Sequence, residues 1–213
     1  MTSLWAAAVR LAFWVLYHPL AWSYDWVSEI VSVGHWREWQ RAGLSRVRGQ
    51  RVLELAFGTG DGLSDLHAAQ HQVVGLDLSP SMVRITQRKL RRRGLSIPLV
   101  RGRTQQLPFA NACFDSVVAT FPAEFIVARS TLGEIARILR PGGQAVIVAM
   151  AELVPDTLWE RFLVGLYQLT GQHDPLPDLS ALLKSLHLVP RVEQVAAGKA
   201  AVTLVFLDKQ VDV

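Results

Sequence analysis

Cysteine is nearly absent from this chain of 213 residues. The single thiol, Cys113, excludes an intrachain disulfide and a cysteine-rich zinc site. The phosphate-binding pattern GxxxxGK(S/T) is also missing, which disfavours hydrolysis of a nucleoside triphosphate. The zinc-protease pattern HExxH does not occur either, so His67 and His71, four positions apart, are interpreted as exposed helix residues. We therefore expect no metal site.

Lysine is scarce as well: 18 of the 22 basic residues are arginine. The net charge of the chain is +4. No RNA- or DNA-binding motif accompanies this excess, so we expect no nucleic-acid partner. The basic run Arg84–Arg93 is interpreted as a solvated helix face, and contact with anionic lipid headgroups is the alternative. Half of the residues are hydrophobic, which excludes a disordered chain and suffices for one core.

The N-terminal segment Leu4–Trp22 is unusually apolar and rich in tryptophan. A membrane-spanning helix needs about 20 apolar residues, but Arg10 and Pro19 interrupt this one. No signal-peptide cleavage site follows it. We expect a helix over Ser3–His18 that covers a pocket of its own domain. Attachment to a membrane surface is the first alternative and a true span is the second.

Strand and helix patterns alternate from residue 51 onward, which predicts a mostly parallel sheet covered on both faces. Short apolar, β-branched runs predict strands at Arg51–Phe57, Gln72–Asp77, Ile97–Arg101, Phe114–Thr120 and Gln144–Met150. Helices are predicted at Gly62–Gln70, Ser79–Arg93, Leu132–Leu139, Leu158–Thr170 and Leu179–Leu186. The two last strands, predicted as an antiparallel hairpin, are Arg191–Ala196 and Ala201–Leu207.

A glycine-rich loop, Gly58-Thr59-Gly60-Asp61-Gly62, follows the first predicted strand. Glycines let the backbone turn sharply and approach a ligand closely, and such loops lie where α/β sheets bind ligands. Asp77 ends the second strand, where a carboxylate can accept hydrogen bonds from both hydroxyls of a ribose. Loop and acid together predict a nucleoside-binding site.

The dinucleotide pattern GxGxxG is incomplete, because position 63 is Leu63. Glu54, inside the first strand, would repel a pyrophosphate and would suit a cationic ligand.

Four ordered segments resemble the motifs of class I S-adenosylmethionine-dependent methyltransferases. They are VLELAFGTGDG (52–62), VVGLDLSPSMV (73–83), LPFANACFDSVVATF (107–121) and RILRPGGQAVIV (137–148). The resemblance covers about residues 24 to 150. Tyr24-Asp25 and the later run GHWREW (34–39) are similar to the start of the ubiquinone/menaquinone C-methyltransferase group.

The resemblance implies a Rossmann-like α/β fold with a seven-stranded, mostly parallel sheet in the order 3-2-1-4-5-7-6, the last strand antiparallel, and an N-terminal helical extension. It divides the chain into a helical cap (1–45) and a cofactor-binding domain (46–213). It also implies S-adenosyl-L-methionine as the cofactor, a small or lipid-like apolar acceptor as the substrate and a cytoplasmic location, with the inner face of the membrane as the alternative.

The same resemblance assigns roles to individual residues. Asp77 would bind the ribose hydroxyls, Leu78 and Met82 would sandwich the adenine, and Thr104 and Gln105 would contact its edge. Phe121 would flank the methyl group, and Tyr24 would cover the cofactor. The residues that would hold the amino-acid part and the ribose are Glu54, Ala56, Phe57, Gly58, Thr59 and Gly60.

A carbon or oxygen acceptor calls for a general base, and the candidates are His35, Asp25, Glu124 and His173. We expect His35 to assist proton removal, with Asp25 as the second candidate. A quinone-type acceptor is favoured, and a phospholipid headgroup N-methyltransferase is the alternative. A non-catalytic cofactor-binding protein is the third reading, because Arg103 occupies a position where an acid or amide often receives the adenine amino group, and arginine has no acceptor.

Overall fold

The computed structural model describes residues 24–155, 157 and 178–211. The predicted helices Ser3–His18 and Leu158–Thr170 lie outside these residues. The described strands are β1 (Arg51–Leu55), β2 (Gln72–Asp77), β3 (Leu99–Arg101), β4 (Phe114–Thr120), β5 (Leu139–Leu153), β6 (Leu188–Ala197) and β7 (Ala200–Lys209). The helices are α2 (Tyr24–Val31), α3 (Trp36–Leu44), α4 (Asp61–Ala68), α5 (Pro80–Arg92), the short 3-10 helix η2 (Glu124–Val127), α6 (Arg129–Ile138) and α8 (Ser180–Ser185).

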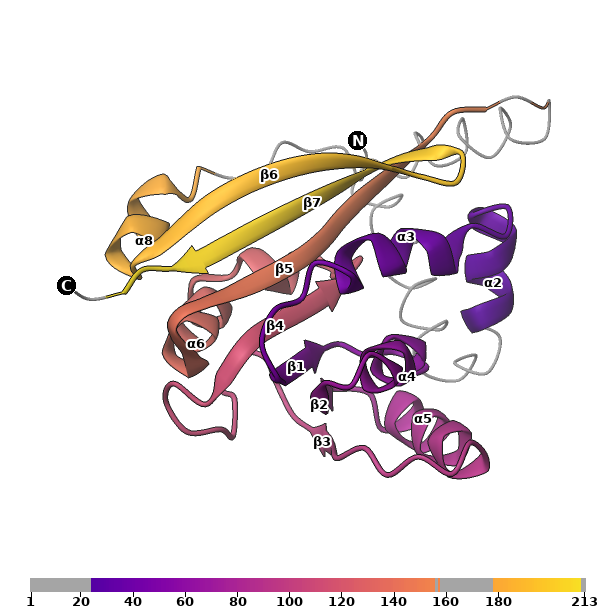
Figure 1. Cartoon of the computed structure of the whole chain (residues 1–213), viewed down its shortest axis with the longest axis horizontal. Helices are drawn as coiled ribbons and strands as arrows, with labels where there is room; N and C mark the ends of the chain where they lie inside the picture. Colours follow the sequence, from indigo (N-terminus) through magenta and orange to yellow (C-terminus); the bar gives the residue numbers. More distant parts are fainter. Residues whose placement is uncertain (1–23, 156, 158–177, 212–213) are drawn as a thin grey trace, which may run out of the picture.

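The seven strands form one sheet in the order β3-β2-β1-β4-β5-β7-β6. Strands β1 to β5 pair in parallel, whereas β7 is antiparallel to both of its neighbours. This confirms the expected strand order and the expected terminal hairpin. Strands β1, β2 and β4 are adjacent and parallel (Figure 1). Their carboxyl ends therefore meet at one edge of the sheet, which holds the loop after β1 and Asp77, the last residue of β2.

Each face of the sheet carries its own apolar core. On one face, residues of α3, α4 and α5 such as Trp39, Leu63 and Leu90 pack against Val52 and Val146. On the other face, α6 and α8 pack over the opposite side chains of the same strands. Side chains alternate across a strand, so strands with near-continuous apolar runs are buried on both faces, as the sequence predicts.

Helix α5 begins as its sequence indicates. The hydroxyl oxygen of Ser79 accepts a hydrogen bond from the backbone N–H of Met82 (3.3 Å), and Pro80 is the first helical residue. The buried side chains are Met82, Thr86 and Leu90, which lie one turn apart on the face toward the sheet. Helix α5 therefore begins three residues after Asp77, the last residue of β2.

Several boundaries differ from the predicted ones. Strand β5 begins at Leu139 and runs through Pro141-Gly142-Gly143, which was expected to separate helix from strand. An irregularity in the pairing between Phe114 and Ser116 of β4 takes up the extra residues. Helix α6 begins at Arg129, three residues earlier than predicted, and β1 ends at Leu55, because Ala56 turns into left-handed backbone (φ +52°).

Helices α2 and α3 fall within the predicted cap 1–45. Helix α3 packs directly on the sheet, since Trp39 and Leu44 belong to the core and a Cβ at Gly43 would collide with Val148 of β5. The division of the chain at residue 46 stays a prediction. In the part that the structure describes, no helix is both long and apolar enough to cross a membrane.

Candidate functional site

The loop after β1 is a tight, left-handed turn at the carboxyl edge of the sheet. Ala56 (φ +52°), Gly58 (φ +56°) and Gly60 (φ +80°) all adopt positive φ. The Ala56 N–H donates to the carbonyl of Leu76 in β2 (2.7 Å), and the Gly60 N–H donates to the carbonyl of Phe57 (2.9 Å). A Cβ at Gly58 would meet nothing within 4 Å. The backbone at Gly58 is therefore open to a ligand.

Asp77 connects this loop to the end of β2. Its Oδ2 accepts the Gly58 N–H (3.0 Å) and its Oδ1 accepts the Ser79 N–H (2.8 Å). Burial raises the pKa of the Asp77 carboxyl, and these backbone N–H groups oppose that rise. The Asp77 carboxylate thus holds the glycine loop and the start of α5 close to the end of β2. Each oxygen keeps acceptor capacity for a further donor.

Glu54 is the second carboxyl group at the site, and its side chain is 1% exposed. Its Oε2 has no hydrogen-bond partner among the described residues. Burial, together with the negative charges of Asp65 and Asp77, raises the pKa of Glu54 to about 8. A Cβ at Gly62 would collide with Oε1 of Glu54, so glycine is needed there for the carboxyl to fit against α4. A buried carboxylate of this kind is stabilised by a positively charged neighbour.

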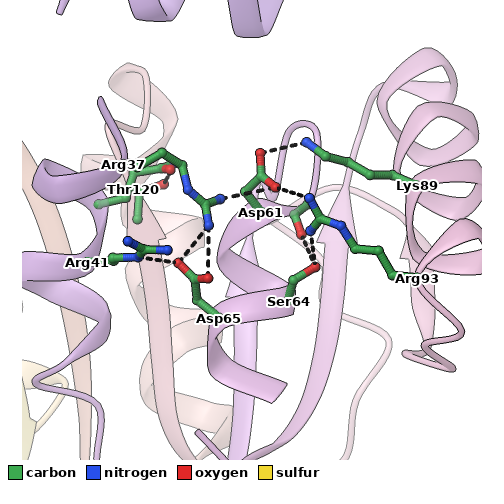
Figure 2. Close-up of polar contacts among 10 residues, drawn as sticks. Arg37, Arg41, Asp61, Ser64, Asp65, Lys89, Arg93 and Thr120 are labelled. Carbon is green, nitrogen blue, oxygen red and sulfur yellow. Dashed lines mark hydrogen bonds and ion pairs between the residues drawn. The ribbon is translucent and has the colours of Figure 1, made fainter. Parts of the chain in front are cut away.

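Ion pairs tie α3, α4 and α5 together (Figure 2). Arg37 of α3 contacts Asp61 (NH1 to Oδ1, 3.1 Å) and Asp65 (NH2 to Oδ1, 2.9 Å), both on α4. The network has three other basic members, from α3, α5 and the residue that follows α5. Arg41 pairs with Asp65 (3.0 Å), and Lys89 and Arg93 both pair with Asp61 (2.6 and 3.2 Å). The network holds α3 and α5 against the helix that follows the glycine loop.

Three aromatic rings lie where β4 ends. Phe121 stacks on Trp36 with ring centroids 4.5 Å apart, and Trp39 meets Phe121 edge-on at 6.3 Å. Phe121 has positive φ (+47°), and its N–H donates to the carbonyl of Val148 in β5 (2.8 Å). Its ring is thus turned toward α3. Trp39 is buried, whereas Trp36 and Phe121 are partly exposed, so these two rings place apolar surface at the same edge of the sheet as Asp77.

The other predicted cofactor residues differ in exposure. Leu78 is 58% exposed beside Asp77, whereas Met82 is fully buried on the sheet-facing side of α5. Phe57, Thr59 and Thr104 are buried too, and Gln105 is exposed. Thr104 forms a hydroxyl–hydroxyl hydrogen bond with Thr131 of α6 (3.3 Å). In this conformation, Leu78 and Met82 therefore do not face the same surface.

The candidate bases are spread over several elements. His35 precedes α3, its Nδ1 lies 3.1 Å from Oε2 of Glu38, and a Cβ at Gly198 in the β6–β7 turn would collide with its ring. Glu124 is exposed on η2. Tyr24 and Asp25 open α2, but their side chains, like His173, lie outside what the structure describes. Within the described ranges, no group of three or more His, Cys, Asp or Glu residues could hold a metal ion.

Two residues at the site were not assigned a role from the sequence. The Thr86 hydroxyl donates to the carbonyl of Gly58 (2.9 Å) and supports the loop from α5. Arg37 links α3 to α4 across 28 residues of sequence. No local pattern identifies either residue, since both contacts arise from the packing of separate helices.

The family described as "Methyltransferase domain" matches residues 52–143. A ubiquinone/menaquinone biosynthesis C-methyltransferase of Yersinia enterocolitica is 34% identical over 156 residues, which cover 69% of this chain and 62% of that protein. The corresponding protein of Erwinia tasmaniensis is 29% identical over 194 residues, covering 87% of this chain and 70% of that protein.

The chain belongs to the class I S-adenosylmethionine-dependent methyltransferases. The expected enzyme class and cofactor are thereby confirmed. A solved structure described as a putative S-adenosylmethionine-dependent methyltransferase from Methanococcus maripaludis shares this methyltransferase's fold (TM-score 0.63, 15% identity, 91% of this chain and 93% of that one). The chain spans about two thirds of the length of the curated relatives.

Proposed function

We propose that this methyltransferase transfers the methyl group to a carbon of an apolar, quinone-type acceptor. The observation that carries the proposal is the pair of buried carboxyl groups at the glycine loop: Glu54 lies against Gly62, and Asp77 accepts the N–H of Gly58, whose backbone is open. The names of the similar C-methyltransferases support the acceptor class. The partly exposed rings of Trp36 and Phe121 support it as well, because planar aromatic rings favour stacking.

The residues at this edge fit S-adenosylmethionine. When bound, this cofactor supplies an electrophilic methyl group on a positively charged sulfur. The buried Oε2 of Glu54 lacks a partner among the described residues and would pair with the positive end of the ligand. Asp77 would accept the ribose hydroxyls while its other lone pairs hold Gly58 and Ser79. Leu78 offers its exposed side chain to the adenine.

The chain's own contribution to the reaction is orientation and exclusion of water. Phe121, fixed by its bond to Val148, would flank the reacting centre, and Trp36 would stack on the acceptor side. Methylation of a ring carbon would require that carbon to give up its proton to a base. His35 is the proposed acceptor of that proton, with Glu38 holding its Nδ1.

Calorimetry of the full chain tests the cofactor site. We expect S-adenosylmethionine and its demethylated product to bind the wild type. Asp77→Ala should weaken the affinity for both compounds by about 100-fold or more, because it removes the carboxylate that would accept the ribose hydroxyls and it releases the glycine loop. Asp208→Ala, at a partly exposed aspartate near the end of β7, is the matched control and should bind normally. If the wild type did not bind S-adenosylmethionine, the proposed function would be wrong.

A methyl-transfer assay tests the acceptor. The full chain is incubated with S-adenosylmethionine that carries a radiolabelled methyl group, and with either a demethylated quinol or phosphatidylethanolamine. We expect the label in the quinol. Label in the phospholipid would contradict the quinone proposal and favour headgroup N-methylation. Cofactor binding without transfer to either compound would leave the family intact and refute this acceptor class.

A further inference from the structure

One long stretch of the chain carries positive charge without any compensating acid. Residues 78–114 contain eight arginines and lysines and no aspartate or glutamate. The rest of the chain has 14 basic and 18 acidic residues. The net charge of +4 therefore conceals a strongly basic segment within a slightly acidic remainder. This segment comprises α5, β3 and the loop that follows β3.

The fold gathers most of these charges on one surface. Four arginines of α5 are exposed at positions i, i+4, i+7 and i+8, a spacing that places side chains on one side of a helix. They are Arg84, Arg88, Arg91 and Arg92. The sheet-facing side chains of α5, by contrast, are the buried Met82, Thr86 and Leu90. The basic side of α5 therefore points away from the core.

The surface continues onto the edge of the sheet. Strand β3 is the terminal strand on this side, and Arg101 at its end and Arg103 beyond it are both exposed. Arg101 Nε donates to the carbonyl of Leu78 (3.4 Å), the residue after Asp77. We call these six residues the arginine face: Arg84, Arg88, Arg91, Arg92, Arg101 and Arg103. It begins beside the cofactor site and extends along α5.

The arginine face has no internal counter-charge. None of its six side chains contacts a carboxylate in the part of the chain that the structure describes. The remaining two cations of the segment, Lys89 and Arg93, both pair with Asp61 of α4 (2.6 and 3.2 Å). Like charges so close together repel one another, and an external anionic surface relieves that repulsion.

We propose that the arginine face docks the enzyme onto an anionic lipid bilayer. Polybasic surfaces are attracted to acidic headgroups within about one Debye length, roughly 8 Å at physiological salt. Nucleic acid is the other common polyanion, but single-stranded recognition uses aromatic side chains as stacking platforms. Residues 78–106 contain no Phe, Trp, Tyr or His. An exposed arginine surface without aromatic side chains therefore matches headgroup phosphates better than splayed bases.

The inference goes beyond the proposed acceptor and does not depend on it. Its charges and exposure come from residues outside the carboxylate pair that carries the proposed function. If both proposals hold, docking places the edge near Leu78 close to a bilayer, where an apolar acceptor is dissolved. Vesicle binding is measured without cofactor, so each proposal can fail without affecting the test of the other.

Flotation of the full chain with vesicles tests the proposal. One set of vesicles is phosphatidylcholine alone, and the other has one part phosphatidylglycerol to two parts phosphatidylcholine. The test variant is R84Q/R88Q/R91Q/R92Q, since glutamine and arginine have similar helix propensity. The matched control is R48Q/R51Q/R129Q/K184Q, which removes four exposed charges elsewhere and gives the same net charge. Circular dichroism verifies the folding of both.

We expect wild type and control to bind the anionic vesicles and to lose binding as NaCl rises from about 0.05 to 0.5 M. The test variant should bind on the order of 100-fold more weakly, because several charges near the surface are lost. Equal binding by test variant and wild type would overturn the proposal, as would equal weakening of variant and control. Tighter binding of duplex RNA than of vesicles, lost in the test variant, would also overturn it.

Discussion

Replacing Glu54 by glutamine should stabilise the cofactor-free enzyme at neutral and alkaline pH. In the folded chain the pKa of Glu54 is raised to about 8 from an ordinary value of 4.5, mainly by burial. The folded state therefore holds this proton more tightly than the unfolded state does. Its contribution to stability is fully present below about pH 4.5 and is lost as pH rises to about 8.

The size of this effect follows from the shift in pKa. One pKa unit corresponds to about 1.4 kcal/mol, and between pH 4.5 and 8 the proton is lost mainly from the unfolded state. The free energy of unfolding therefore falls, relative to acidic pH, by about 3 kcal/mol at pH 7 and by roughly 5 kcal/mol above pH 8. Glu54→Gln abolishes the titration. We expect the free energies of unfolding of variant and wild type to diverge steadily from pH 5 to pH 8, with the variant more stable.

Urea denaturation at each pH unit from 5 to 9, without cofactor, measures this divergence. Glu152→Gln is the matched control, because Glu152 is exposed on β5. Calorimetry completes the test: cofactor affinity of the wild type should rise up to about tenfold per pH unit below pH 8, and that of Glu54→Gln should be low and nearly flat. Unfolding curves whose pH dependence is the same in variant and wild type would refute the reasoning.

Three further predictions concern the surroundings of the site. Ala56→Gly should stabilise the chain by about 1 kcal/mol in urea, because Ala56 has positive φ, whereas Ala68→Gly at the end of α4 should destabilise it by a similar amount. Arg37→Met should lower the free energy of unfolding by about 1–2 kcal/mol, because two aspartates of α4 each lose one partner. Arg41→Met, at a more exposed site, should lower it by less than about 0.5 kcal/mol. Equal losses in the two variants would contradict a central role for Arg37. His35→Ala should lower the single-turnover rate about tenfold or more and leave cofactor affinity unchanged; an unchanged rate would remove His35 as the base.

Local patterns were sufficient wherever one element determined the outcome. The strands Gln72–Asp77 and Phe114–Thr120 have the predicted bounds, because short β-branched runs between turn residues leave few alternatives. Ser79 and Pro80 place the start of α5 in the same way. The glycine loop and Asp77 were found because backbone turning and a strand end are local properties. The motif resemblance supplied the strand order.

Tertiary packing decided the rest. Arg37 reaches Asp61 and Asp65 because two helices far apart in sequence cross at the loop, and no periodicity encodes that crossing. The pKa of Glu54 depends on its burial and on neighbouring carboxylates from other elements. Strand β5 extended through Pro141-Gly142-Gly143 because its pairing with β4 tolerated an irregularity. The sequence alone determined the fold class and the kind of ligand, since these follow from short-range chemistry. Which charges lie buried, paired or exposed was decided by the folded chain, because burial and distance exist only in three dimensions.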